Sequence, residues 1–282
     1  MSDESVPVAA YQPEPPPTVR GSICAVLAYC AGDAPGTATN QLLIAHREAP
    51  AAFEQALFES VLLRVLTAPQ HRPVTTAGML RELAGAVASV ENSSDVQPLR
   101  ERVVQWLLEV NGGSDHGARD TGVRWRTCIL LAALLKASFS AHLGEHAMHR
   151  EGQGLSPQLF AAASEYLFAH IRDRSADVRL AAVQGLDVIK LKHDGADQAV
   201  AERAVQDCDA HVRAASVRAL VTCSDTVPQD VVAHARLDCA PRVRRLLLRA
   251  LEEKIRSGRE DWKTVWPSIV LNSLGDRSSG VR

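Results

Sequence analysis

The feature of this sequence that most constrains its fold is a seven-residue unit that recurs four times in the second half of the chain. Each unit begins with Asp, has Val five residues later and ends with Arg. The units are Asp173–Arg179, Asp207–Arg213, Asp238–Arg244 and Asp276–Arg282, and they start 34, 31 and 38 residues apart. The first three continue into apolar stretches that end in Leu, and each follows another stretch with helical spacing. Self-similarity at this period predicts one pair of helices per repeat.

The spacing within each unit has a physical explanation in the short turn between two antiparallel helices. Such a turn needs a hydrogen-bond acceptor near the start of its second helix, and Asp supplies one. Val falls one turn into that helix, where it is buried, and the following Arg reaches the Asp of its own or an adjacent turn. The sequence therefore predicts a structural ladder made of Asp173, Arg179, Asp207, Arg213, Asp238 and Arg244.

Composition favours helices over strands. Of the 282 residues, 46% are hydrophobic and 4% are aromatic, and Ala, Leu and Val make up most of the apolar share. Ala and Leu are strong helix formers, whereas strands are enriched in aromatic and β-branched residues. The chain is also longer than a single hydrophobic core usually organises. We therefore expect an all-α fold, and not a β-sandwich.

Three segments are predicted along the chain. Residues 1–39 form a flexible, Pro-rich arm, because a run such as Pro15-Pro16-Pro17 cannot enter a packed element. Residues 40–154 form N-terminal helical repeats, including a helix from Val123 to Phe139 that is apolar almost all round. Residues 155–282 form the aligned repeats and stop at the start of a repeat helix, so we expect a chain truncated at its C-terminus. The last repeat should then expose an apolar edge through Val265, Ile269, Val270 and Leu274.

The kind of helical repeat is indicated by the unit itself. Periods of about 33 or 34 residues also fit ankyrin and tetratricopeptide repeats. The chain has neither the Thr-Pro-Leu-His motif of the first nor the spaced Trp, Leu, Gly and Tyr of the second. The D-x4-V-R unit is typical of HEAT repeats. We therefore expect an α-solenoid of antiparallel HEAT-like helix pairs, which is an armadillo-type superhelix.

Longer stretches of the chain resemble one family of HEAT-repeat proteins. Val123–Leu131, Leu155–Phe160 and Leu167–Leu186 look like the N-terminal part of the condensin G subunit, the non-SMC HEAT-repeat subunit of condensin I. The order and spacing continue to match through Arg242–Arg245 and Leu274–Arg282. The resemblance covers about residues 50–282, although the chain lacks the Lys/Arg-rich helix that the family usually has before residue 50.

The resemblance implies a function as well as a fold. It implies a curved scaffold that binds the kleisin subunit of a ring built on the SMC ATPase heterodimer, and that grips double-stranded DNA without sequence specificity along a basic groove. It also implies a role in mitotic chromosome condensation, in the nucleus and on chromosomes with a cytoplasmic pool. We accordingly expect no enzymatic activity, no cofactor, no small-molecule substrate and no membrane association. A generic HEAT adaptor, such as a phosphatase scaffold or a transport receptor, shares the fold and stays open as an alternative.

Candidate DNA contacts lie mainly outside the ladder, because a ladder Arg is already used in the fold. Arg242, Arg245 and Arg249 are spaced to share one helix face, opposite the apolar stripe. Weaker candidates for phosphate contacts are Arg174, Lys190 and Lys192. Since Glu252 and Glu253 follow closely and the net charge of the chain is −2, an ordinary solvated face is the alternative interpretation.

One motif suggests a third class of function, a zinc hydrolase. The stretch His142-Leu-Gly-Glu145-His146 has the H-x-x-E-H form of an inverted zinc-peptidase motif, and His149 follows it. Such a site needs both histidines on one firm helix, yet Gly144 lies inside the motif and further glycines follow. We therefore interpret this stretch as a loop between repeats, and expect neither a metal site nor catalytic residues.

Overall fold

The structure of the protein is a computed structural model in which every regular element is a helix. It describes residues 46, 48–62, 66, 78, 80, 81, 83–85, 87, 99–112, 120–142, 155–189, 193–223, 229–256 and 266–281. Within these residues 83% are helical and none is in a strand. The all-α fold class is thereby confirmed for this part of the chain. The predicted arm, residues 1–39, lies outside it.

The chain divides into two compact units, and the first comprises Met1–Ala68. Its described part begins with helix α3 (Pro50–Ala56), which runs directly into the six-residue π-helical segment η1 (Leu57–Leu62). Pro50 is at the first helical position, where the missing N–H costs no hydrogen bond. Phe53, Leu57 and Leu62 are all buried, in agreement with their spacing in the sequence.

The second unit, Pro69–Arg282, contains nine helices whose bounds lie within the described residues, besides single helical residues between Gly78 and Val87. They are α6 (Leu99–Gly112), α7 (Thr121–His142), α8 (Pro157–His170), α9 (Ala176–Val188), α10 (Ala196–Gln206), α11 (Ala210–Cys223), α12 (Gln229–Leu237), α13 (Pro241–Arg256) and α14 (Trp266–Leu274). Each of the three complete seven-residue units spans a turn and the first residues of the helix that follows, which is α9, α11 or α13.

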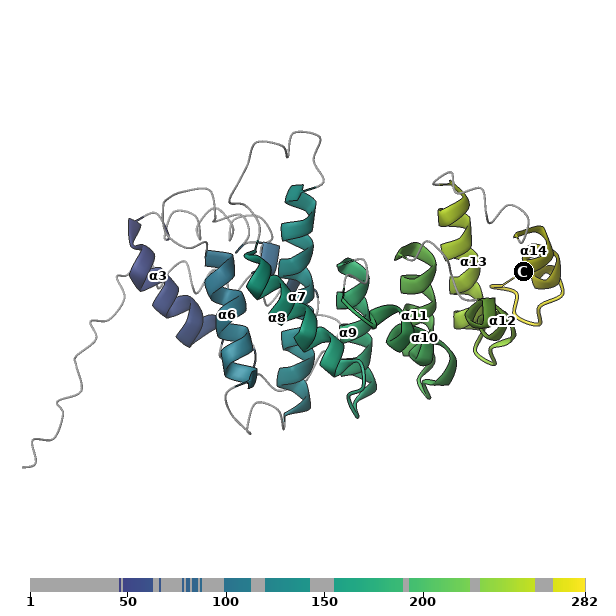
Figure 1. Cartoon of the computed structure of the whole chain (residues 1–282), viewed down its shortest axis with the longest axis horizontal. Helices are drawn as coiled ribbons and strands as arrows, with labels where there is room; N and C mark the ends of the chain where they lie inside the picture. The colour runs from purple at the N-terminus through teal and green to yellow at the C-terminus, as the bar shows by residue number, and fades with distance from the viewer. Residues whose placement is uncertain are drawn as a thin grey trace, which may run out of the picture. The chain divides into compact units, whose positions relative to one another are not determined.

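The helices of the second unit pack in an alternating order. Helix α9 packs against α7 and α11, and α11 packs in turn against α13. Each of these also packs against the helix that precedes it in the chain: α8 against α9, α10 against α11, and α12 against α13 (Figure 1). Helices α7, α9, α11 and α13 therefore form one row, and the intervening helices cover one side of it.

Burial follows the apolar pattern of each helix. Helix α7 was expected to be apolar almost all round, and Leu130, Leu131, Leu134 and Leu135 in it are all buried. In α13, by contrast, the buried residues recur at helical spacing and charged residues occupy the remaining face. Burying one such stripe is what holds an amphipathic helix in place, since each large apolar side chain contributes about 1.5–3 kcal/mol when fully buried.

Two glycines are required by the backbone. A Cβ atom on Gly185 in α9 would lie 2.8 Å from both methyl carbons of Leu167 in α8, so only glycine allows these two helices to come this close. Gly195 precedes α10 with φ of 77°, a left-handed conformation that favours glycine. Both positions therefore fix the geometry of the α8–α9–α10 connection.

The last described helix corrects one expectation from the sequence. Ile269 was predicted to be part of an exposed apolar edge, but it is buried, because it faces inward where α14 meets α13. Leu274 is 59% exposed, as predicted, and Leu271, which the prediction did not include, is 68% exposed. Val265 lies outside the described residues.

Candidate functional site

Four arginine–aspartate pairs connect helices of the row to the turns that follow. Each arginine donates from Nε to one carboxylate oxygen and from Nη2 to the other. The pairs, with these two distances, are Arg124–Asp173 (2.6 and 3.1 Å), Arg179–Asp207 (2.7 and 2.8 Å), Arg213–Asp238 (2.7 and 2.9 Å) and Arg244–Asp276 (2.6 and 2.7 Å). We call this set the Arg–Asp ladder. Every arginine in it pairs with the carboxylate in the next turn, and not with the Asp carboxylate of its own unit.

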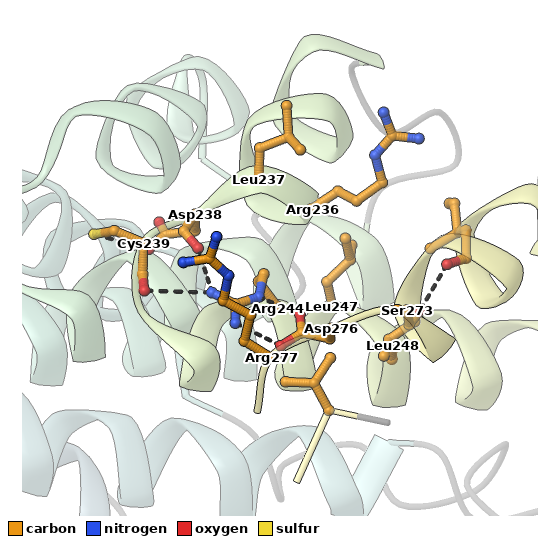
Figure 2. A pocket seen from close by; sticks show the side chains of 13 residues that line it. Arg236, Leu237, Asp238, Cys239, Arg244, Leu247, Leu248, Ser273, Asp276 and Arg277 are labelled. Atoms are coloured by element: carbon orange, nitrogen blue, oxygen red, sulfur yellow. Dashed lines mark hydrogen bonds and ion pairs between the residues drawn. The ribbon is translucent and has the colours of Figure 1, made fainter. Parts of the chain in front are cut away.

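In three of the four pairs the second terminal nitrogen of the arginine, Nη1, also holds the arginine's own turn together. Nη1 of Arg179 donates to the carbonyl oxygens of Asp173 (2.9 Å) and Arg174 (3.2 Å), the first two residues of its unit. Arg213 and Arg244 make the equivalent pairs of bonds in their units. Figure 2 shows this arrangement around Arg244, which lies between Cys239 and Asp276. One guanidinium group therefore joins two consecutive turns.

Each ladder Asp caps a turn and not a helix, which differs from its predicted role. Oδ1 of Asp207 accepts the N–H of Asp209 (2.9 Å), two residues further on, and helix α11 begins after that residue. Asp209 itself accepts the N–H groups of His211 (2.7 Å) and Val212 (3.2 Å), so it is the residue that caps α11. The ladder Asp is thereby left free to receive the arginine of the preceding unit.

Burial and charge reinforce the ladder. Burial by itself raises the pKa of the Asp207 carboxyl, but hydrogen bonds from Arg179 and from the Asp209 N–H outweigh it and hold the pKa below its usual range. The same balance lowers the pKa of Asp173 and of Asp238. Hydrogen bonds to the carboxylates raise the pKa of the four partner groups, Arg124, Arg179, Arg213 and Arg244. These groups are therefore charged at neutral pH and already occupied.

Arg124 is a ladder residue that the sequence pattern did not reveal. In each seven-residue unit an Asp stands six residues before the Arg, whereas Ala118 stands six residues before Arg124. Asp120 is the counterpart of Asp209, since it stands four residues before the arginine and caps α7 by accepting the N–H groups of Gly122 (2.6 Å) and Val123 (3.0 Å). The dipeptide Val123-Arg124 at the start of an apolar helix could have indicated this ladder position, since the other units also end in Val-Arg.

The predicted basic residues of α13 lie on its exposed face. Arg242, Arg245 and Arg249 are all exposed, whereas Val243 and Leu247 on the same helix are buried. Arg242 contacts the imidazole of His211 in the preceding unit. The Arg245 guanidinium lies against the last turn, where a Cβ on Gly280 would be 2.8 Å from its Nη2 atom.

A fourth exposed arginine extends this face onto the neighbouring helix. Arg218 in α11 and Arg249 in α13 are each eleven residues after the Asp of their units, and both are exposed. Since α11 and α13 pack together, the two side chains occupy the same register on adjacent helices. We call Arg218, Arg242, Arg245 and Arg249 the basic face. Neither Arg218 nor Arg249 forms an ion pair with any residue that the structure describes.

Of the weaker candidates for phosphate contacts, Arg174 is described by the structure and does not belong to the basic face. Arg174 is exposed, but it lies in the turn before α9, where its carbonyl oxygen accepts a bond from Arg179. Lys190 and Lys192 lie outside the described residues. The structure therefore groups only the α13 candidates, together with Arg218.

The zinc-peptidase motif lies almost wholly outside the described residues. His142 is the last residue of α7, and the structure does not describe Glu145, His146 or His149. In the part of the chain that is described, no three His, Cys, Asp or Glu side chains are placed to hold a metal ion. None of the described helices combines the length and the apolarity that crossing a bilayer requires.

No protein-family model matches this chain, and neither does any curated protein. The class of molecule is therefore defined by the fold alone, which is all-α with paired helices tied by an Arg–Asp ladder.

Proposed function

We propose that this protein is an α-solenoid of HEAT-like helix pairs, an armadillo-type superhelix, that serves as a scaffold and binds double-stranded DNA through its basic face. The fold is supported by the alternating packing of α8 to α13 and by the ladder that joins one helix pair to the next. The proposed class is non-catalytic, as the resemblance to the condensin G subunit implies.

The observation that carries the DNA proposal is the pair Arg218 and Arg249. Two guanidinium groups in the same register on adjacent packed helices, with Arg242 and Arg245 on the same exposed side of α13, suit a ligand that presents successive anions. The phosphate backbone of a duplex is such a ligand, and Arg is well suited to phosphate because its donors match two oxygens at once. Contacts of this kind position a protein on DNA without reading its sequence.

The proposed biological setting follows from the resemblance to the condensin G subunit. We propose that the chain binds a kleisin subunit and acts with an SMC ATPase heterodimer in mitotic chromosome condensation, in the nucleus and on chromosomes. The chief alternative is a generic HEAT adaptor of the phosphatase-scaffold or transport-receptor type, because the ladder would serve any such scaffold equally well. Affinity purification of the chain, followed by identification of the proteins that co-elute, separates the two.

A triple variant tests the DNA contact directly. Replacing Arg242, Arg245 and Arg249 with Gln should weaken binding equally for duplexes of unrelated sequence. Because each phosphate contact contributes about 0.9 to the slope of log affinity against log salt, the slope should flatten by about two to three units. A control with the same loss of charge is available in Arg172, Arg236 and Arg277, which lie near the turns and outside the basic face.

The control triple Gln variant should keep a salt slope close to that of the wild type. Circular dichroism of both variants establishes that they are folded. If the basic-face variant is folded and retains the wild-type affinity and salt slope, the proposed DNA contact is wrong and the face is ordinary solvated surface.

A further inference from the structure

A second surface of the molecule has a different chemistry from the basic face. Helices α7 and α9, together with helical residues between Gly78 and Val87, enclose a hollow of about 420 Å³. The described residues that line it are Arg81, Gly85, Ile129, Ala132, Ala133, Lys136, Ala181, Gln184 and Val188. We call it the α7–α9 groove. It belongs entirely to the second compact unit.

The floor of the groove is apolar and made of small residues. Gly85, Ala132, Ala133 and Ala181 line it together with the aliphatic side chains of Ile129 and Val188. A Cβ atom added to Gly85 would contact nothing within 4 Å, so the space above this glycine is open. Small residues allow another backbone to come close, which is why they recur where helices pack tightly. Such a floor suits the apolar face of a helix.

The charge of the groove is positive. Arg81 and Lys136 are both exposed, and neither forms an ion pair with another residue in the described part of the chain. Among the described residues that line the groove, none is acidic. A ligand with carboxylates beside its apolar face would therefore meet two available cations and no like charge.

We propose that the α7–α9 groove binds an acidic amphipathic helix of a partner protein. The apolar floor would take the helix's small and aliphatic side chains, and Arg81 and Lys136 would pair with its Glu or Asp residues. Helix-in-groove recognition combines these two elements, apolar anchors at helical spacing and flanking charge. A DNA backbone fits less well, because it has no apolar surface to bury on Ile129, Ala133 and Val188. The inference stands without the DNA contact proposed above.

The test uses a phage-displayed library of random peptides of about 18 residues, which is five helical turns, selected against the full chain. The expected products are peptides with apolar residues at i, i+3, i+4 and i+7 and acidic residues beside them. The affinity of each selected peptide for the wild type and for two variants is then measured by fluorescence anisotropy. G85L fills the groove where a side chain has room, and R81E/K136E reverses its charge. Each variant should weaken binding by about tenfold or more.

Matched controls separate this site from the basic face. R218Q/R249Q should leave peptide binding unchanged and weaken duplex DNA, whereas G85L should weaken the peptide and leave DNA binding unchanged. Both circular dichroism and the retained DNA binding report that G85L is folded. The proposal is overturned if selection yields no acidic amphipathic peptide, if the selected peptides bind G85L and R81E/K136E as well as the wild type, or if duplex DNA responds to these two variants as the peptide does.

Discussion

Arg244 and Arg245 are consecutive residues of α13, yet they belong to two different regions of the molecule. Arg244 donates to both oxygens of Asp276 and to two carbonyl oxygens of its own turn. Arg245 is exposed on a different face of the helix and lies beside Gly280. A step of one residue rotates a side chain by about 100° around a helix, which is enough to move a guanidinium group from the ladder to the surface.

The comparison shows that arginine content alone does not indicate a binding surface. The ladder arginines use most of their donors within the fold, on a carboxylate and on carbonyl oxygens of a turn. The arginines of the basic face have available donors but contribute little to the fold. We therefore propose that the position of an arginine relative to the D-x4-V-R unit separates residues that stabilise the fold from candidates for recognition, and substitutions can test that proposal.

The largest effect is expected at the most buried pair. In Arg179–Asp207 the two side chains are 8% and 1% exposed. Arg179→Ala would leave Asp207 with the N–H of Asp209 as a hydrogen-bond donor and with the more distant Arg203, at 3.8 Å, as its ion-pair partner among the described residues. Breaking a buried ion pair by removing one partner typically costs about 3–5 kcal/mol, because the remaining charge is buried without compensation. Urea unfolding should show a loss of this size for R179A. A loss below about 1 kcal/mol, within the range of a surface substitution, would mean that the ladder does not hold the turns together.

A smaller loss is expected at the last pair of the ladder. The side chains of Arg244 and Asp276 are 17% and 10% exposed, so water can partly solvate Asp276 when its partner is removed. We expect Arg244→Ala to cost about 1.5–3 kcal/mol, the usual value of hydrogen bonds to a charged group. Measuring R244A beside R179A under the same conditions tests the ranking. An equal or larger loss in R244A would show that burial does not determine the strength of the pairs.

Acid should weaken the ladder. The pKa values of Asp173, Asp207 and Asp238 are lower in the folded chain than their ordinary values, so on acidification the unfolded chain takes up protons first. The stability from these groups is therefore fully present above the unfolded Asp pKa of about 3.9 and is lost as pH falls below it. In unfolding experiments between about pH 5 and pH 2, the wild type should lose stability more steeply than a variant that lacks the pair, R179A/D207A. Parallel pH profiles would contradict a role for ionised Asp207.

The smallest effect on stability is expected on the basic face. Arg218→Gln and Arg249→Gln each remove an exposed charge and leave the buried residues of their helices in place. Each should change the free energy of unfolding by no more than about 0.5 kcal/mol. A loss of about 2 kcal/mol or more at either position would show that the residue supports the fold and would remove it from the list of candidate DNA contacts.

Much of the helical architecture could be predicted because its signals are local. The apolar run of α7 and the stripe of α13 follow directly from residue spacing, and Asp with Arg in each unit indicated that they would meet. The direction of that contact could not be derived, because the Asp of a unit's own turn and that of the next are both within reach of a long side chain. The ladder role of Arg124 could not be predicted from the unit, because Ala118 stands where the unit has Asp.

The candidate sites were predicted less completely for a related reason. Arg242, Arg245 and Arg249 lie in one helix, so their residue spacing alone predicts that they share a face. Arg218 joins them only because α11 packs beside α13, and the α7–α9 groove depends on residues about 100 positions apart, from Arg81 to Gln184. Such sites arise from tertiary packing, and a single sequence contains no local pattern for them.

The forward direction of the ladder has a consequence for how a chain of this kind can grow. Each seven-residue unit contains an acceptor for the unit before it and a donor for the unit after it, as in Asp207 and Arg213. A duplicated gene segment that encodes one turn with its two helices would therefore supply both missing partners wherever it was inserted between two existing units. Lengthening by duplication then leaves every Arg–Asp pair of the ladder complete at both junctions, and intervals as different as 31 and 38 residues are compatible with the same pairing between turns.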